Sequence, residues 1–195
     1  MADDISRYRR PEYPIESLFV RRWSPRAMAG TAVDEASLMR LFEAARWAPS
    51  SYNNQPWRFL YARRETPHWE VFFDLLAETN RLWAKDAGAL LTILAKETFD
   101  NGAPSVTHCL DVGSAWENLA LQGTAMGLVV HGMQGFDYAR ARENLGVPED
   151  YSVLAMAAVG WPGRAEDLPE ALRAREYPSD RKPIAEIAFE GPYPP

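Results

Sequence analysis

The sequence predicts a single-domain α/β or α+β fold. Segments with the apolar spacing of helices alternate with short apolar runs of strand length, and no internal repeat is present. The chain has 195 residues, of which 47% are hydrophobic and 25% charged, as is usual for soluble globular proteins. A chain of this length buries about two-thirds of its unfolded surface, so one domain over residues 1–195 is expected.

The first strong helix signal begins after Asp34, a suitable N-cap, where apolar side chains recur at helical spacing. Pro49 disfavours helical geometry at the preceding residue and ends this helix. A short strand is expected at 58–62. A further helix is expected to carry four apolar side chains on one face: Trp69, Phe72, Phe73 and Leu76.

Residues 89–94 form an uninterrupted apolar run of strand length, and 108–127 has the pattern of a buried helix. Strands are also expected at 128–131 and 152–159. Between them lies a helix that Asp137 caps and Gly146 ends. Three glycines weaken the helix at 108–127 and could let another backbone approach it: Gly113, Gly123 and Gly127.

The two ends of the chain differ from the middle. Residues 1–14 are charged and contain prolines, which suits a surface arm. Residues 164–195 are rich in proline and are expected to form an extended tail, apart from a short helix after Pro169.

The charge balance narrows the classes of partner. A net charge of −6 and a pI near 5.2 argue against broad binding to nucleic acid or anionic membrane, because both need a large cationic face. The apolar stretches at 87–95 and 153–159 are shorter than a bilayer span, and the N-terminus has no signal-peptide core. A cytoplasmic location without membrane contact is therefore expected.

The cysteine and histidine content argues against metal and disulfide chemistry. Cys109 is the only cysteine, and we expect it to be a small buried residue at the start of a helix rather than a nucleophile. The three histidines are scattered, so no metal site is expected. The chain also lacks G-x-G-x-x-G, Walker A, H-E-x-x-H and G-x-S-x-G motifs, which argues against Rossmann dehydrogenases, P-loop enzymes and serine hydrolases.

A basic cluster at 21–26 reads R-R-W-S-P-R. The planar donor fork of arginine matches phosphate oxygens, and a serine hydroxyl adds a compact donor. A solvated basic turn before a helix explains the same charges equally well.

A polar segment at 49–57 reads P-S-S-Y-N-N-Q-P-W. Its amides and hydroxyls can donate and accept, which suits the mixed edge of a heterocycle such as a flavin. A turn-rich loop between a helix and a strand would have the same composition, and composition alone favours that interpretation.

Together, the two segments resemble the nitroreductase family of FMN enzymes, whose chains begin with R-x-S-x-R and continue to P-S-S-x-N-x-Q-P-W. The first motif is matched by Arg22, Ser24 and Arg26. The second is matched by Pro49, Ser50, Ser51, Asn53, Gln55, Pro56 and Trp57. The resemblance extends over about residues 20–187 and includes a central interface helix, matched by Asp111, Gly113, Ala115, Asn118 and Leu119.

The resemblance implies a three-layer α/β/α member of the α+β class, with a mostly antiparallel central sheet. It also implies a homodimer with FMN at the interface and exchanged C-terminal tails. Arg22, Arg26 and Ser24 would bind the FMN phosphate, and Arg181 would complete that grip. Asn53 would bind the isoalloxazine or the ribityl chain. The full implied set is Arg22, Trp23, Ser24, Arg26, Pro49, Ser50, Ser51, Asn53, Gln55, Met133, Gln134, Gly135 and Arg181.

Three residues depart from the family pattern: Trp23 stands where Arg or His is common, Gln134 where Glu is common and Ser179 where Lys is common. These departures bear on phosphate affinity and substrate preference.

By this resemblance the chain would pass hydride from NADH or NADPH through FMN to a small electron-poor acceptor, such as a nitroaromatic, a quinone or an enal or enone, in a ping-pong reaction. FMN would carry the chemistry, so no catalytic side chain is assigned. The alternatives are an FMN-binding protein without turnover, and a flavin-dependent dehalogenase or flavin-consuming enzyme of the same fold.

Overall fold

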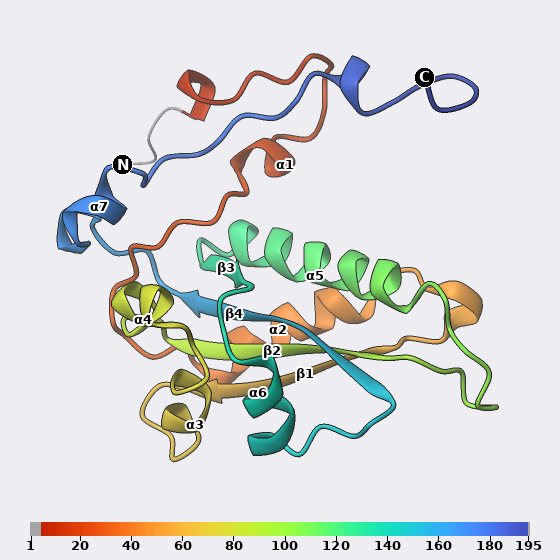
Figure 1. Cartoon of the computed structure of the whole chain (residues 1–195). Helices are drawn as coiled ribbons and strands as arrows, with labels where there is room; N and C mark the ends of the chain where they lie inside the picture. Colours follow the sequence, from red (N-terminus) through yellow and green to blue (C-terminus); the bar gives the residue numbers. More distant parts are fainter. Residues whose placement is uncertain (1–4, 195) are drawn as a thin grey trace.

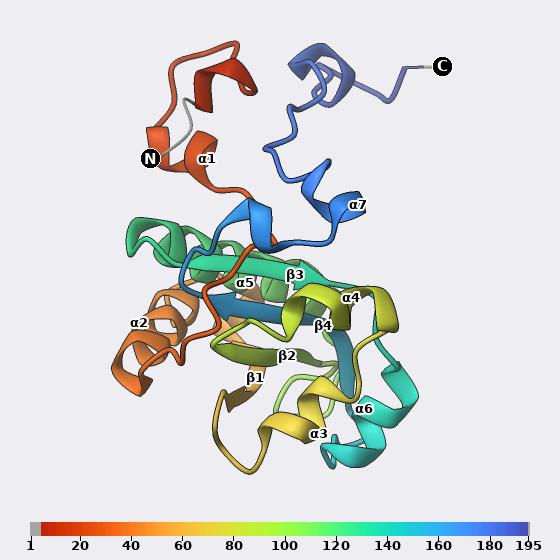
Figure 2. The same ribbon diagram turned by 90° about the vertical axis from the view of Figure 1, so that its left-hand side faces the viewer.

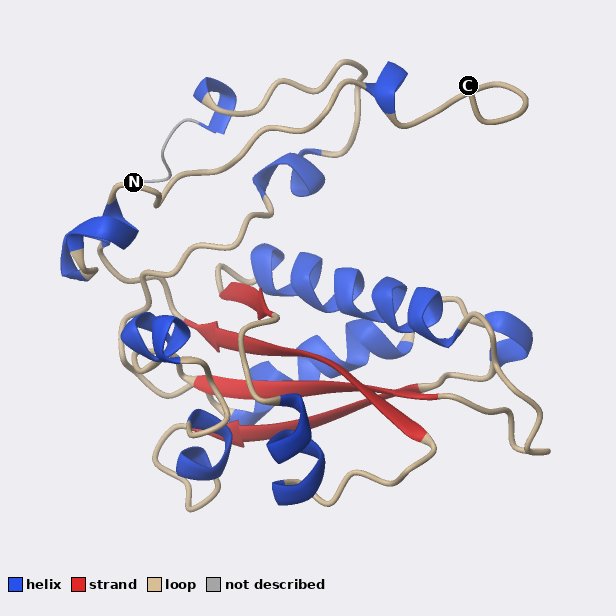
Figure 3. Cartoon of the chain, in the orientation of Figure 1, coloured by secondary structure: helices blue, strands red, loops and turns tan. Residues whose placement is uncertain are grey.

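The computed structural model describes residues 5–194, whose centre is a four-stranded antiparallel sheet (Figures 1 and 3). The strand order is β1 (Trp57–Arg63), β2 (Ala89–Lys96), β4 (Tyr151–Gly160) and β3 (Val129–Met133). Each neighbouring pair is antiparallel. The α+β class is thereby confirmed, and all four expected strands are present.

Helices cover both faces of this sheet. The first face is covered by α2 (Glu35–Arg46) and α5 (His108–Ala125). The opposite face is covered by α3 (Trp69–Phe73), α4 (Glu78–Ala84) and α6 (Tyr138–Asn144). The result is the three-layer arrangement that the family resemblance implied (Figure 2).

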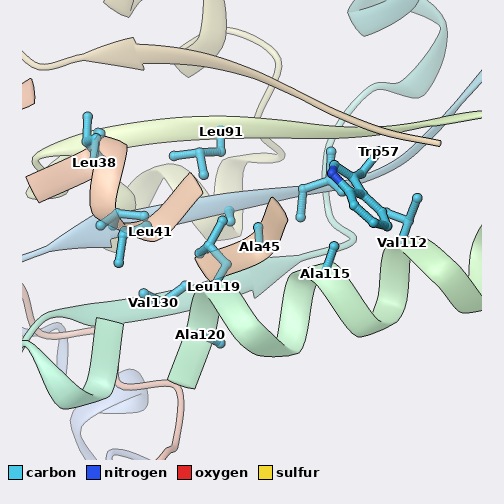
Figure 4. Packing of buried hydrophobic residues seen from close by; sticks show 14 of the residues in the cluster. Leu38, Leu41, Ala45, Trp57, Leu91, Val112, Ala115, Leu119, Ala120 and Val130 are labelled. Atoms are coloured by element: carbon cyan, nitrogen blue, oxygen red, sulfur yellow. The ribbon is translucent and has the colours of Figure 1, made fainter. Parts of the chain in front are cut away.

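Alternation along β2 divides the core into two clusters, because successive strand side chains point to opposite faces. Leu91 packs with Leu41 of α2 and Leu119 of α5 (Figure 4). Its neighbour Leu90 packs in the other cluster with Trp83 of α4. All five of these leucine and tryptophan side chains are essentially inaccessible to solvent.

The predicted helix caps are confirmed. The Asp34 carboxylate accepts a hydrogen bond from the Ser37 N–H at 2.8 Å, at the start of α2. The Asp137 carboxylate accepts one from the Arg140 N–H at 2.9 Å, at the start of α6. Gly146, with φ of +62°, follows the end of α6.

Two expectations about helices were wrong. The helix α3 ends at Phe73, because the N–H groups of Leu75 and Leu76 donate to carbonyl oxygens three residues back rather than four. Leu76 lies outside the helix, is buried, and forms an isolated antiparallel β-bridge with Phe136. The helix α5 is buried on one face only, and Leu110 on the other face is 71% exposed.

The burial expected for Cys109 was also wrong, because this side chain is exposed. The core-facing stripe of α5 contains Val112, Ala115 and Leu119. Cys109 lies at the edge of that stripe and borders an open cavity instead.

The N-terminal arm and the C-terminal tail run together on one side of the sheet (Figures 1 and 2). The arm contains α1 (Ser17–Arg21), and the tail contains α7 (Glu170–Arg173), the short helix expected after Pro169. The rings of Tyr8 and Tyr177 stack with centroids 5.8 Å apart. Residues 1–4 of the expected arm and residue 195 of the tail lie outside the described residues. Within 5–194, no helix is long and apolar enough to cross a bilayer.

Candidate functional site

The segment at 22–26 follows α1 and contacts α5. The Arg22 Nε atom lies 3.6 Å from an Oε1 atom of Glu117 in the middle of α5. The Arg22 guanidinium also donates to the Ser24 hydroxyl at 3.4 Å. Two members of the predicted phosphate motif are therefore in contact, and Trp23 between them is half-buried.

His131 of β3 fixes the middle of this segment. Its Nδ1 atom lies 2.8 Å from the carbonyl oxygen of Pro25, and since a carbonyl only accepts, Nδ1 carries the donated proton. The imidazole packs on Trp83 with ring centroids 4.4 Å apart. Burial lowers the pKa of His131, and the positive charge of Arg26 lowers it further. The neutral ring is thereby favoured.

Glu176 of the tail fixes the end of the segment. Its Oε1 atom accepts from the backbone N–H groups of Arg26 at 2.6 Å and Ala27 at 2.9 Å. Its Oε2 atom makes no hydrogen bond but lies 3.7 Å from the Arg26 guanidinium, and the Glu176 side chain is only 4% exposed. Arg26 therefore already has a buried anionic partner, unlike Arg22, whose partner Glu117 is half-exposed.

Arginines from three segments line one cavity of about 520 Å³ between the N-terminal arm, the tail and α5. Arg181 from the tail lines the same cavity as Arg22, so these two expected phosphate ligands are brought together. Arg181 is exposed and donates to the Ser179 carbonyl and hydroxyl oxygens. The charged residues lining this cavity include Arg9, Arg22, Glu117, Asp180, Arg181 and Lys182. We call this cavity the cationic cavity.

The loop at 49–56 has a strained backbone. Tyr52, Asn53 and Gln55 have φ angles of 49°, 55° and 48°, in the left-handed region that side chains other than glycine rarely adopt. Each such residue costs about 1–3 kcal/mol, and such strain persists where surrounding contacts enforce it, often at binding sites.

Two contacts enforce this loop conformation. The Ser50 hydroxyl accepts from the Gln55 N–H at 3.0 Å. The Ser51 N–H donates to Asp111 Oδ2 at 3.2 Å, and Asp111 is a buried carboxylate in the first turn of α5. The loop exposes Pro49 and Asn53 to solvent.

A second cavity, of about 510 Å³, is lined by uncharged residues of α5, β2, β3 and β4. Met133 and Gln134 line it, opposite Gly113 and Trp116 of α5. Gly135 follows Gln134 but does not itself line the cavity, and its carbonyl oxygen accepts from the Ala77 N–H and the Asn80 side chain, both at 2.9 Å. This neutral cavity suits a planar heterocycle, and we call it the neutral cavity.

Both cavities border α5, since Trp116 lines the neutral cavity and its sequence neighbour Glu117 lines the cationic cavity. The predicted residues from Pro49 to Gln55 line neither cavity of their own chain. Sequence reasoning also missed contacts made by Arg9, His131 and Glu176, which no motif marks. Within residues 5–194, no group of three or more histidine, cysteine or acidic side chains could hold a metal ion.

Comparison with known proteins agrees with this geometry. The model of the nitroreductase family matches residues 20–79 and 64–161. Protein DrgA from Synechocystis sp. is 31% identical over 162 residues, which cover 69% of this chain and 76% of that protein. A Streptomyces coelicolor protein provisionally named NADH dehydrogenase/NAD(P)H nitroreductase is 28% identical over 184 residues, covering 78% and 86% of the two chains.

A solved structure described as an oxidoreductase containing FMN has the same fold over nearly its whole length. The TM-score is 0.92, the sequences are 42% identical, and the match covers 95% of this chain and 96% of that one.

Proposed function

Because the chain belongs to the nitroreductase family, we propose that it is an FMN-dependent oxidoreductase that passes hydride from NADH or NADPH to a small electron-poor acceptor. The observation that carries this proposal is that one helix, α5, borders both the cationic and the neutral cavity. FMN has a dianionic phosphate at one end and a planar, mostly apolar ring system at the other. Its two ends match the chemistry of the two cavities.

The residues of the cationic cavity fit the phosphate. Arg22 and Arg181 offer guanidinium groups whose donor forks suit phosphate oxygens, and Ser24 adds a hydroxyl next to Arg22. Arg26 is engaged by the buried Glu176, so we assign it to shaping the segment rather than to direct contact.

The residues of the neutral cavity fit the flavin ring. Trp116 and Met133 supply apolar surface, while Gln134 and the backbone near Gly135 supply polar groups at its edge. The hydrogen bonds from Ala77 and Asn80 fix the backbone there before any ligand binds. Bound FMN would accept and donate the hydride, so the protein's task is to position it and to stabilise negative charge.

The loop at 49–56 would act on FMN held by a second copy of this chain. Its strained backbone is typical of a binding site, yet its residues line neither cavity of their own chain. Apolar side chains near it are open to solvent, including Tyr52 at 94% and Leu110 at 71% exposure. We therefore propose a homodimer in which Ser50, Ser51 and Asn53 of one copy reach the flavin of the other.

Anaerobic mixing tests the proposal. The purified protein should contain, or take up, a chromophore that is released as FMN, and added NADH or NADPH should bleach its oxidised absorbance. A nitroaromatic, quinone or enone should then restore that absorbance. Flavin that stays oxidised under both nicotinamides would indicate FMN binding without turnover, and mass spectrometry of the products would reveal loss of the flavin itself. Failure to bind FMN at all would overturn the proposal.

A further inference from the structure

Arg9 joins three segments of the chain that are separate in sequence. Its Nε atom donates to the Ser179 carbonyl oxygen of the tail at 2.8 Å. Its NH1 atom donates to the carbonyl oxygens of Val20, at 2.8 Å, and of Arg22. Arg9 is only 8% exposed, although it belongs to an otherwise exposed arm. One guanidinium therefore connects the arm, the Arg22 segment and the tail that carries Arg181.

Within residues 5–194, the same guanidinium makes no ion pair with a carboxylate. Its three hydrogen-bond acceptors in this part of the chain are neutral carbonyl groups. Burial lowers the pKa of Arg9, and the positive charges of Arg181 and Arg22 lower it further, while Asp180 opposes this. The fold thus brings Arg9, Arg22 and Arg181 together among the charged residues of the cationic cavity, and the mutual repulsion of these three guanidinium groups opposes the close approach of the tail.

A dianion bound between Arg22 and Arg181 would relieve that repulsion. Binding of the dianion would then favour docking of the tail, because a ligand that binds one conformation more tightly shifts the chain toward that conformation. By the same coupling, a docked tail would raise the affinity for the dianion. The buried Glu176 anchors the start of the tail without a ligand. Beyond Glu176 the contacts of the tail include the bond from Arg9 to Ser179, the stacking of Tyr8 on Tyr177 and the bond from the Ile184 N–H to Glu12 at 3.1 Å.

We propose that Arg9 is a positioning residue that couples docking of the C-terminal tail to binding of the FMN phosphate. This inference rests on the proposed FMN site. The Arg9 guanidinium binds the backbone carbonyl of Arg22 and that of Ser179, two residues before Arg181. The guanidinium groups of Arg22 and Arg181 are thereby held at the same cavity. A merely structural role of Arg9 would support flavins with and without a phosphate equally.

Riboflavin, which lacks the phosphate, separates these two roles. Apo full-length protein would be titrated with FMN and with riboflavin in the wild type, Arg9→Gln and Arg9→Lys. We expect Arg9→Gln to lower FMN affinity by about tenfold or more and to leave riboflavin affinity within about twofold. Arg9→Lys keeps the charge but loses the donor fork, so an intermediate loss is expected. The matched control is Arg7→Gln, which removes an exposed charge from the same arm.

Trypsin digestion of the wild-type protein gives a second readout that needs no variant. The tail contains cleavage sites at Arg173, Arg175 and Arg181. Saturating FMN should slow cleavage in the tail by about tenfold or more, whereas riboflavin should slow it little. In Arg9→Gln, this protection by FMN should be lost.

Three outcomes would overturn the inference. They are unchanged FMN affinity in folded Arg9→Gln, an equal loss of affinity for FMN and riboflavin, and equal protection of the wild-type tail by both flavins. If Arg9→Gln does not fold, the wild-type digestion alone decides. Failure of the wild type to bind either flavin would instead reject the proposed function.

Discussion

The Nδ1 atom of His131 lies 2.8 Å from the carbonyl oxygen of Pro25, which ties β3 to the segment of the cationic cavity. Because the imidazole is buried against Trp83 and near Arg26, its pKa is lowered from 6.5. The neutral ring therefore contributes stability that is fully present above the unfolded pKa of about 6.5. That contribution is lost as pH falls below this value toward the lowered folded-state pKa.

The pH dependence can be measured by urea unfolding of the wild type and His131→Gln between pH 8 and pH 5. The Gln side chain does not titrate but can still donate to Pro25. We expect the free energy of unfolding of the wild type to fall more steeply with acidification than that of His131→Gln. His68→Gln, at an exposed position, is the control and should keep the wild-type slope. Parallel profiles for the wild type and His131→Gln would contradict the prediction.

Arg22→Ala should give a folded protein that purifies with little flavin. Its ion pair with the half-exposed Glu117 at 3.6 Å contributes about 1 kcal/mol or less to stability, so the melting temperature should change little. Loss of a guanidinium from the proposed phosphate site should lower FMN affinity by about tenfold or more. Arg21→Ala removes an adjacent exposed arginine and should retain FMN. Equal flavin content in both variants would exclude Arg22 from the site.

The local elements of the fold could be predicted because their signals are local. The Asp34 and Asp137 caps and the apolar runs of the strands involve residues within a few positions of each other. The pairing of those strands involves long-range contacts, so residue patterns left α/β and α+β open until the family resemblance favoured an antiparallel sheet. Cys109 was misjudged because its burial depends on a cavity formed by three strands and α5.

The candidate site was predictable only in part for the same reason. Motifs identified Arg22, Ser24 and Arg181, which the fold does bring near one another. The contacts that fix them join Arg9 to Ser179, Glu176 to Arg26 and His131 to Pro25, across 170, 150 and 106 positions. No short pattern encodes such pairs, and a lone charged residue in an arm or tail usually stays in solvent.

Two glycines of α5 should respond oppositely to alanine. A Cβ atom at Gly123 would lie 2.4 Å from Val130 Cγ2 in β3, so this glycine makes room for a side chain of the sheet rather than for another backbone. Gly123→Ala should destabilise the protein by about 1–3 kcal/mol. A Cβ atom at Gly113 meets nothing within 4 Å, so Gly113→Ala should stabilise the apo protein by up to about 1 kcal/mol through helix propensity. Chemical unfolding measures both, and equal effects would contradict this packing.

Asp111 should control the strained loop at 49–56. Its buried carboxylate accepts from the Ser51 N–H at 3.2 Å and from the Thr107 hydroxyl at 3.4 Å. Asp111→Ala removes these acceptors, leaves the Ser51 N–H without its partner, and should cost about 1–3 kcal/mol in the free energy of unfolding.

Relaxation of the loop should also weaken the proposed contact of Asn53 with the flavin, because its φ of 55° would no longer be enforced. We therefore expect Asp111→Ala to lower FMN and riboflavin affinity together, in contrast to Arg22→Ala, which should lower FMN affinity alone. Asp111→Asn keeps one acceptor oxygen for the Ser51 N–H and should recover most of the loss. Loss of FMN binding with normal riboflavin binding in Asp111→Ala would show that the loop acts at the phosphate rather than at the ring.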